Sequence, residues 1–189
     1  MRGNRFIRYV PNLITIISML SGILVLFIVF CQKGEAYRLE SCFMILIAVI
    51  FDAFDGKIAR TYNVESALGK QLDSFADFVS FGLAPIAILL THSSFRETGY
   101  ITYICFALYS LAAAFRLARF NTGDFSNHFL GLPITAAGLI LIITNLIIHY
   151  FAYNKRTFSI IPIYILICIL AILMMSNIKI KRLSHIRNR

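Results

Sequence analysis

The sequence predicts an all-α polytopic membrane protein with six transmembrane helices and a short N-terminal amphipathic helix at the lipid surface. Of the 189 residues, 59% are hydrophobic, and the mean hydropathy is +0.77, whereas soluble domains have an apolar share of about 45–50%. The apolar residues form six segments, and a helix needs about 20 residues to cross a bilayer. The six segments lie near residues 10–31, 39–60, 71–91, 99–118, 130–152 and 158–178.

These segments occupy most of the chain, so we expect one membrane domain over residues 1–189 and no separate soluble domain. Its predicted parts are, in order, an interfacial helix at 1–10, a six-helix bundle at 11–178 and a basic tail at 179–189. The interfacial helix is indicated by Arg2, Arg5 and Arg8 at three-residue spacing among apolar residues. Pro11 should open the first span, because a proline at the first helical position costs no helical hydrogen bond.

The basic residues predict the orientation. With six spans and an inside N-terminus, the outside loops hold Lys33, Arg38, Arg96, Lys155 and Arg156, and the other 13 of the 18 basic residues lie inside. The positive-inside rule then places both termini in the cytoplasm, and a site formed by Asp52, Asp55, Asp73 and Asp77 would open to the same side. The net charge of +9 suits an anionic lipid surface, and no motif indicates nucleic-acid binding. No targeting sequence precedes the spans, so we expect the cell (inner) membrane of a bacterium or archaeon.

Four aspartates interrupt the apolar pattern between residues 51 and 77. Asp52 and Asp55 are spaced i,i+3, and Asp73 and Asp77 are spaced i,i+4, so each pair projects from one face of a helix. Two facing helices would gather four carboxylates, which repel one another unless cations neutralise them. Oxygen ligands without nearby His or Cys favour Mg²⁺ or Mn²⁺ over zinc. Pairing with nearby basic residues is the structural alternative, but it does not explain the small residues between the aspartates.

This stretch resembles the signature of the CDP-alcohol phosphotransferase family, whose positions are all filled here by Asp52-x₂-Asp55-Gly56-x₂-Ala59-Arg60-x₈-Gly69-x₃-Asp73-x₃-Asp77. The resemblance implies attack of an alcohol on the phosphatidyl phosphorus of a CDP-linked lipid, release of CMP, two divalent cations (Mg²⁺ or Mn²⁺) and a homodimer. It also implies that Asp52 and Asp73 bridge the two metals and that Asp55 and Asp77 bind one each. Asp77 would also be the general base.

Other stretches are similar to the phosphatidylserine synthase branch of the family, which implies CDP-diacylglycerol and L-serine as substrates. They are Pro11-Asn12, VSFGLAP at 79–85, RLARFN at 116–121 and FLGLP at 129–133. The similar stretches extend over roughly residues 10–135. The last two spans look like generic hydrophobic helices.

Several residues are candidates for binding the CDP-lipid. The resemblance implies contacts from Gly56, Arg60 and Ser66. Ala59 and Gly69 lack bulk and would let a base or diphosphate approach the backbone, although small residues also allow tight helix crossing in membranes.

Two polar residues lie at the cytosolic end of the first expected span. Asn12 and Thr15 are further candidates for the CDP-lipid site. Helix capping is an equal alternative for both.

The acceptor needs a cation outside the metal cluster for its carboxylate. Arg116 and Arg119 are i,i+3 neighbours at the cytoplasmic end of the fourth span and could form charge-assisted hydrogen bonds, with Asn121 as a weaker candidate. Ordinary membrane anchoring is the alternative for both arginines. Asn145 and His149 are expected to be satisfied polar residues rather than ligands, and Pro85 should kink the third span.

Three other functions remain open. The same aspartates could serve another acceptor, such as glycerol 3-phosphate, inositol phosphate or a second amino alcohol. Aspartates inside a membrane also mark cation transporters, but a repeated half of that kind is missing after residue 100. A catalytically inactive scaffold would retain lipid binding without turnover, and the intact metal-ligand positions argue against it.

Overall fold

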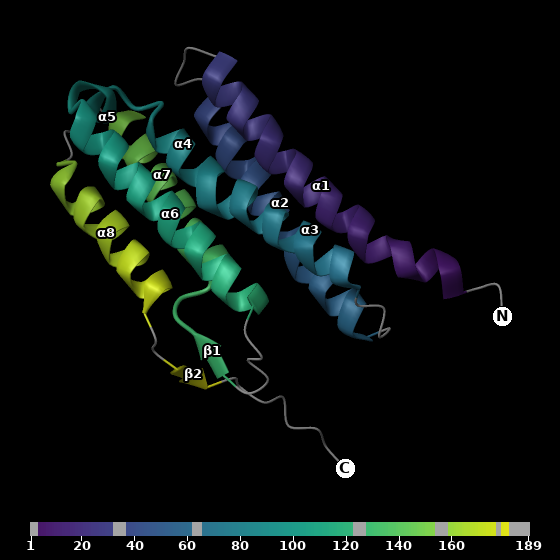
Figure 1. The fold of residues 1–189 in the computed structure, drawn as a ribbon. Helices are drawn as coiled ribbons and strands as arrows, with labels where there is room; N and C mark the ends of the chain where they lie inside the picture. Colours follow the sequence, from purple (N-terminus) through teal and green to yellow (C-terminus); the bar gives the residue numbers. More distant parts are fainter. Residues whose placement is uncertain are drawn as a thin grey trace.

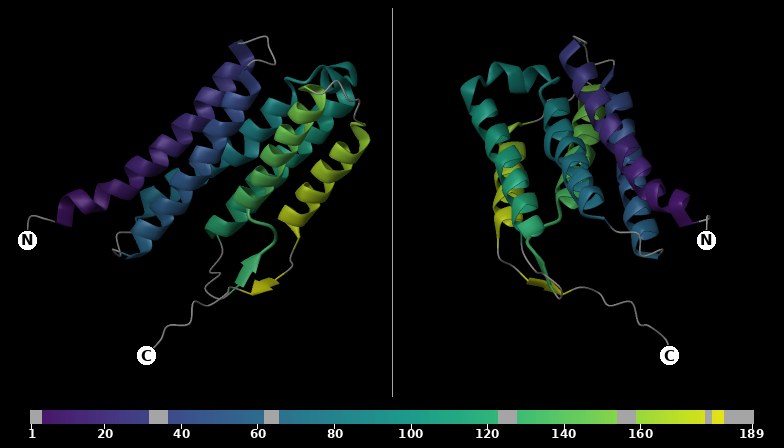
Figure 2. Two further views of the ribbon diagram at one scale, coloured as in Figure 1. Left: turned by 180° about the vertical axis from the view of Figure 1, so that it is seen from behind. Right: turned by 45° about the vertical axis from the view of Figure 1, so that its right-hand side comes forward.

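The protein is a bundle of roughly aligned helices (Figure 1). The computed structural model describes residues 4–31, 37–61, 66–122, 128–153, 159–176 and 179–181. The N-terminal ends of α1 and α3, the C-terminal end of α2 and a small strand pair lie at one end of the bundle, and α5 lies at the opposite end. The two further views show the same arrangement (Figure 2).

Helices α1 and α2 form an antiparallel pair. Helix α1 runs from Asn4 to Cys31 and α2 from Arg38 to Thr61, and they pack against each other along their lengths. Pro11 lies inside α1 rather than at its start. The expected separate helix at 1–10 is therefore not distinct in the described residues, because the backbone from Asn4 continues into the first span. One missing N–H at Pro11 is not enough to end a long apolar helix.

The next helical path contains a change of helix type. Helix α3 spans Ala67–Asp77, a π-helix labelled η2 spans Phe78–Leu83, and α4 spans Ala84–Leu89. Ser66 is the N-cap of α3, and its hydroxyl accepts a hydrogen bond from the N–H of Gly69. The irregularity expected at Pro85 thus takes the form of a widened turn that precedes the proline.

The second half of the chain completes the bundle. Its elements are α5 (Ser93–Glu97), α6 (Tyr100–Thr122), β1 (His128–Leu130), α7 (Ile134–Tyr153), α8 (Ile161–Met175) and β2 (Lys179–Lys181). The strands pair antiparallel, with Phe129 opposite Ile180. The expectation of an all-α chain missed this short pair, which joins the segment before α7 to the one after α8. The rest of the described fold is helical.

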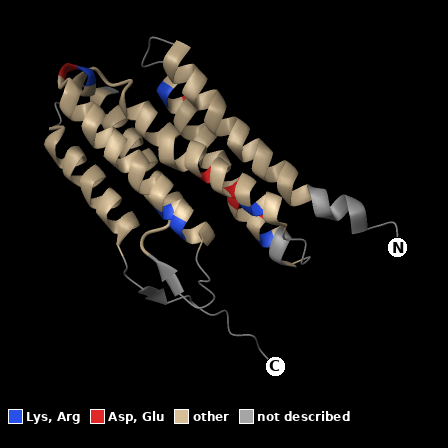
Figure 3. Ribbon diagram, in the orientation of Figure 1, with Lys and Arg blue, Asp and Glu red and all other residues tan. Residues whose placement is uncertain are grey.

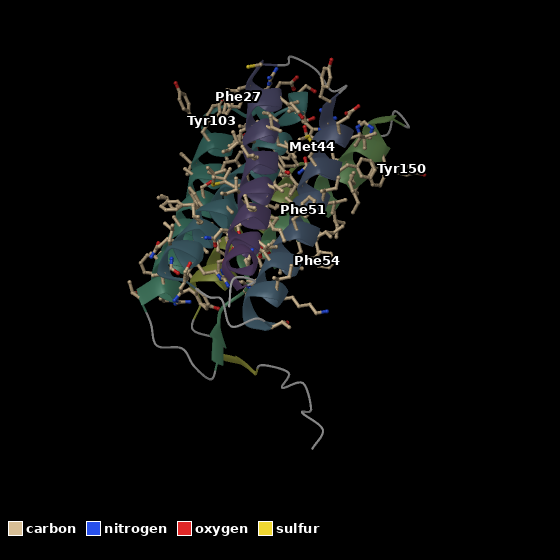
Figure 4. All side chains as sticks on the ribbon, turned by 90° about the vertical axis from the view of Figure 1, so that its right-hand side faces the viewer. Phe27, Met44, Phe51, Phe54, Tyr103 and Tyr150 are labelled. Atoms are coloured by element: carbon tan, nitrogen blue, oxygen red, sulfur yellow. The ribbon has the colours of Figure 1, made fainter. Side chains whose placement is uncertain are left out.

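Within the described residues, four helical segments are long and apolar enough to cross a membrane. They are Val10–Cys31, Ala67–Leu89, Tyr100–Thr122 and Ile134–Ala152. Helix α8 is apolar but only 15 residues long, and α2 carries the charged residues of the aspartate segment. Large apolar side chains cover the outside of the bundle, including Phe27, Phe54 and Tyr103 (Figure 4). An outer surface of this kind suits contact with lipid.

Candidate active site

The aspartates of α2 and α3 meet near one end of the bundle, as their spacing predicts. One carboxylate oxygen each from Asp52, Asp55 and Asp73 lies within 4.8 Å of the others. Figure 3 shows acidic residues gathered on these two helices, with basic residues beside them. The i,i+3 and i,i+4 spacings bring the pairs onto facing sides because both segments are α-helical here.

Asp77 completes the group. Its carboxyl group approaches that of Asp52 closely enough for a hydrogen bond between them. Its Oδ1 atom is buried and has no hydrogen-bond partner among the described residues. Two adjacent carboxylates repel unless a proton or a cation lies between them. A buried oxygen without a donor, beside three further carboxylates, fits hard divalent cations such as Mg²⁺ or Mn²⁺.

Asp55 is held by two donors. The hydroxyl of Thr15 on α1 donates to Oδ2 of Asp55 over 2.6 Å, and the backbone of Gly56 provides a second hydrogen bond. Thr15 is only 5% exposed and Asp55 only 3%. The hydroxyl also lies 3.0 Å from the carbonyl oxygen of Pro11, but an ionised carboxylate is the stronger acceptor for its single proton. Thr15 therefore contacts the carboxylate cluster.

Three predicted lipid-binding residues meet at the start of α3. A Cβ atom placed on Gly69 would lie 2.8 Å from Oδ1 of Asn12 and 3.0 Å from the hydroxyl oxygen of Ser66. A side chain at position 69 would therefore displace the amide of Asn12. Asn12, Ser66 and Gly69 thus form one polar corner beside the aspartates, built from α1 and the N-terminus of α3.

Arg116 and Arg119, the two arginines predicted to bind the acceptor, contact different parts of the protein. Arg116 is only 8% exposed and interacts electrostatically with Asp77, which offsets part of the cost of burying either charge. The Nε atom of Arg116 is buried without a hydrogen-bond partner in the described part of the chain.

Arg119 contacts the C-terminal end of α8. Its guanidinium donates to the carbonyl oxygens of Met175 and Ser176 at the end of α8, over 3.2 and 3.1 Å. Carbonyls at a helix C-terminus lack intrahelical donors, and a cation there also suits the helix dipole. The two arginines therefore do not converge on one point.

Asn121 is joined to Ser74, a residue that the sequence did not single out. The amide of Asn121 donates to the hydroxyl of Ser74 over 2.9 Å. This contact links the C-terminal end of α6 to α3 immediately after Asp73. The side chains of Ala59 and Arg60 lie outside the described residues.

Asn145 was expected to be satisfied rather than a ligand. Its amide nitrogen donates to the carbonyl oxygens of Pro85 and Leu141, which joins α7 to α4. Its Oδ1 atom, like Nδ1 of His149, is buried without a hydrogen-bond partner among the described residues, so the prediction of satisfied polar groups is confirmed only for the amide nitrogen of Asn145.

The sequence profile of the CDP-alcohol phosphatidyltransferases matches residues 8–178, which include all four aspartates and the residues around them. The chain belongs to this family. The match extends beyond the signature at 52–77 to all the long helices and to most of the chain.

Relatives in the family act on serine according to their names. The chain is 34% identical over 175 residues to the CDP-diacylglycerol–serine O-phosphatidyltransferase of Bacillus subtilis, covering 90% of this chain and 89% of that protein. The protein of the same name from Methanocaldococcus jannaschii is 31% identical, with 90% and 72% covered. An archaetidylserine synthase from Methanothermobacter thermautotrophicus is 35% identical, with 69% and 55% covered.

This arrangement can perform displacement at phosphorus. Four carboxylates can hold divalent cations, which stabilise negative charge on the entering and leaving oxygens of an in-line displacement. Arg116 supplies a buried positive charge beside Asp77, and the corner of Asn12, Ser66 and Gly69 offers polar side chains beside a glycine backbone. The family membership and the site chemistry therefore agree.

Proposed function

We propose that the chain is a membrane-embedded enzyme that transfers the phosphatidyl group of CDP-diacylglycerol to the hydroxyl of L-serine, giving phosphatidylserine and CMP. The observation that carries this proposal is the meeting of Asp52, Asp55 and Asp73 within 4.8 Å, with Asp77 next to Asp52, in a chain of this family. The serine acceptor is supported by the names of relatives that match about nine-tenths of the chain.

In the proposed reaction the hydroxyl oxygen of serine forms a bond to the phosphatidyl phosphorus, and the bond from that phosphorus to the CMP oxygen breaks. Asp77 accepts the hydroxyl proton, and CMP leaves with the bonding electron pair. Two divalent cations, Mg²⁺ or Mn²⁺, would stabilise the negative charge on the entering and leaving oxygens. Asp52 and Asp73 would bridge these cations, and Asp55 and Asp77 would hold one each.

The remaining site residues would bind the two substrates. We assign the CDP-lipid to Asn12, Gly56, Ser66 and Gly69, together with Ala59 and Arg60. Thr15 would act on this site through Asp55, because its hydroxyl is already engaged there.

Arg116 is the best placed residue for the carboxylate of serine. It is buried beside the proposed base, and its Nε atom has no hydrogen-bond partner among the residues that the structure describes. The proposed parts of Arg119 and Asn121 in acceptor binding have less support, since Arg119 contacts α8 and Asn121 contacts Ser74.

The membrane arrangement is part of the proposal. We infer one domain with six spans, in which α2 and α8 join the four segments that are apolar and long enough by themselves. Both termini and the aspartates would face the cytoplasm from the inner membrane, because six spans with an inside N-terminus assign 13 of the 18 basic residues to that side. A homodimer is inferred from the family resemblance.

The test is CMP release from CDP-diacylglycerol by purified protein in mixed micelles containing Mn²⁺ or Mg²⁺. L-serine, glycerol 3-phosphate and inositol phosphate are compared as acceptors, with and without a chelator. Asp77→Asn keeps the side-chain size but removes the base, and we expect a loss of roughly 10²- to 10⁴-fold. Ser94→Ala near the opposite end of the bundle is the matched control and should keep full activity.

Each outcome decides one claim. Serine-dependent release that disappears with chelator and with Asp77→Asn supports the whole proposal. Release with another acceptor retains the reaction class and overturns the serine assignment. No release with any acceptor, combined with metal-dependent cation flux into vesicles, would replace the enzyme by a cation transporter.

A further inference from the structure

The π-helix η2 follows Asp77 directly and has an identifiable cause. Asp77 keeps helical dihedral angles, with φ −54° and ψ −48°, so α3 continues into η2 without a break. At the other end, the N–H of Ala84 bonds to the carbonyl of Val79, five residues earlier. The following residue, Pro85, has no N–H, so the carbonyl of Phe81 loses the donor that an α-helix would provide.

Tyr109 on α6 supplies the missing donor. Its hydroxyl donates to the carbonyl oxygen of Phe81 over 3.1 Å, and both residues are fully buried. A buried carbonyl without a donor is costly, so this hydroxyl stabilises the backbone of η2 at the point where the proline interrupts it.

Two other helices hold η2 from other sides. The hydroxyl of Ser80 donates to the carbonyl of Ser18 on α1 over 3.0 Å. On α7, a Cβ atom at Gly138 would lie 2.8 Å from Cβ of Phe81. We refer to these contacts of Ser18, Tyr109 and Gly138 as the η2 contacts. They fix the π-helix against three neighbouring helices.

The π-helix determines which way the aspartates of α3 face. Its hydrogen bonds run from i to i+5, so the segment accommodates about one residue more than an α-helix of equal length. One residue of an α-helix corresponds to a rotation of roughly 100°. If residues 78–83 were α-helical while α4 kept its packing, Asp73 and Asp77 would be turned by about this angle away from Asp52 and Asp55.

We propose that Tyr109 is a positioning residue for the proposed reaction: through the carbonyl of Phe81 it keeps η2 in the π form, and η2 holds Asp73 and Asp77 toward α2. In the described part of the chain the Tyr109 hydroxyl bonds to the carbonyl of Phe81, so it would act on the aspartates through the backbone of η2. The expected change in kcat rests on the proposed function. The expected change in Mn²⁺ affinity depends only on the carboxylate cluster.

The test compares Tyr109→Phe with the wild type. This variant keeps the ring and removes only the hydroxyl. Tyr103→Phe is the matched control, since Tyr103 lies on the same helix, is 55% exposed and points outward (Figure 4). Mn²⁺ affinity is measured without substrates from the paramagnetic resonance signal of unbound Mn²⁺. Melting temperature in chelator, kcat and both KM values are measured on the same preparations.

We expect Tyr109→Phe to bind Mn²⁺ roughly three- to tenfold more weakly, the equilibrium equivalent of one hydrogen bond. The kcat should fall by a similar factor, with both KM values within about twofold of the wild type. Tyr103→Phe should match the wild type. A lower melting temperature with unchanged Mn²⁺ affinity would overturn the proposal, because Tyr109 would then only stabilise the fold, and unchanged values throughout would overturn it as well.

A second variant covers the case in which Tyr109→Phe does not fold. Ser80→Ala removes the hydrogen bond to α1 and should weaken Mn²⁺ binding in the same direction; unchanged Mn²⁺ affinity would contradict the inference. Failure of the proposed function is distinguishable, since it would appear as a wild type that binds Mn²⁺ but releases no CMP with serine.

Discussion

The hydroxyl oxygen of Thr15 lies 2.6 Å from Oδ2 of Asp55, which joins the first helix of the bundle to one of the four clustered carboxylates. The contact is buried, and Asp55 also receives a hydrogen bond from the backbone of Gly56. The carboxylate is therefore oriented before any cation binds. In metal sites, groups that orient the ligands are typically worth 10–100-fold in metal affinity or activity.

Replacing Thr15 by valine should weaken Mn²⁺ binding by roughly 10- to 100-fold, because valine keeps the shape and loses the donor. Thr15→Ser retains the hydroxyl and should keep most of the affinity. Titration of both variants with Mn²⁺, together with the Mn²⁺ dependence of CMP release, checks this. Equal affinities for the two variants would mean that Asp55 does not depend on this bond.

Arg119→Gln should lower stability without changing acceptor binding. The variant loses two hydrogen bonds from a charged group to the end of α8, which is worth about 1–3 kcal/mol of unfolding free energy. The KM for serine should stay within about twofold of the wild-type value. Arg116→Gln is the comparison, and its KM for serine should rise at least tenfold, since Arg116 is the cation beside Asp77. A raised KM in Arg119→Gln would restore Arg119 to the acceptor site.

Gly69→Ala should impair binding of the CDP-lipid. The added methyl group would lie 2.8 Å from Oδ1 of Asn12, so the asparagine must move. We expect the KM for CDP-diacylglycerol to rise roughly tenfold, which corresponds to about 1.4 kcal/mol, while the KM for serine changes little. Leu68→Ala at the neighbouring exposed position is the control. A variant with wild-type KM for the lipid would show that this corner is not part of its site.

Stability should depend on pH through His92, which lies between α4 and α5, outside the membrane-spanning segments. Burial lowers the pKa of His92 to about 3, and the charge of Arg38 and the proximity of His149 act in the same direction. Between that pKa and the unfolded value of about 6.5, the unfolded state binds more protons, so stability falls as the pH decreases through this range.

The melting temperature in detergent, recorded from pH 7.5 to 4.5, checks the role of His92. The contribution has a limiting slope of about 1.4 kcal/mol per pH unit. His92→Gln cannot take up this proton and should have a flatter profile than the wild type. Parallel profiles for the two proteins would assign the acid sensitivity to other groups.

The sequence was sufficient for those features that depend on one helix at a time. The i,i+3 and i,i+4 spacings of the aspartates determine which sides of α2 and α3 they occupy, and the facing arrangement then follows from the cost of exposing charges to lipid. Ser66 before a helical segment similarly indicates an N-cap, and the structure has it as the cap of α3.

Features that depend on partners distant in the sequence were not predictable in this way. Tyr109 is one of nine tyrosines, and nothing near it indicates that its hydroxyl meets the carbonyl of Phe81, 28 residues away. The i,i+3 spacing suggests that Arg119 and Arg116 bind the same ligand. The guanidinium of Arg119 instead donates to carbonyl oxygens at the end of α8. Pro85 indicated an irregularity, whereas the form it takes depends on α1, α6 and α7 together.

The η2 contacts also have a consequence for how the protein is made. Ribosomes deliver the chain from its N-terminus, so Thr15 and all four aspartates emerge before Tyr109 and Gly138. A nascent chain that has been synthesised as far as Leu89 contains all four aspartates. It still lacks α6 and α7, which are two of the three helices that contact η2. The charged cluster therefore reaches the membrane before its geometry is secured, and its maturation has to wait for α6 and α7.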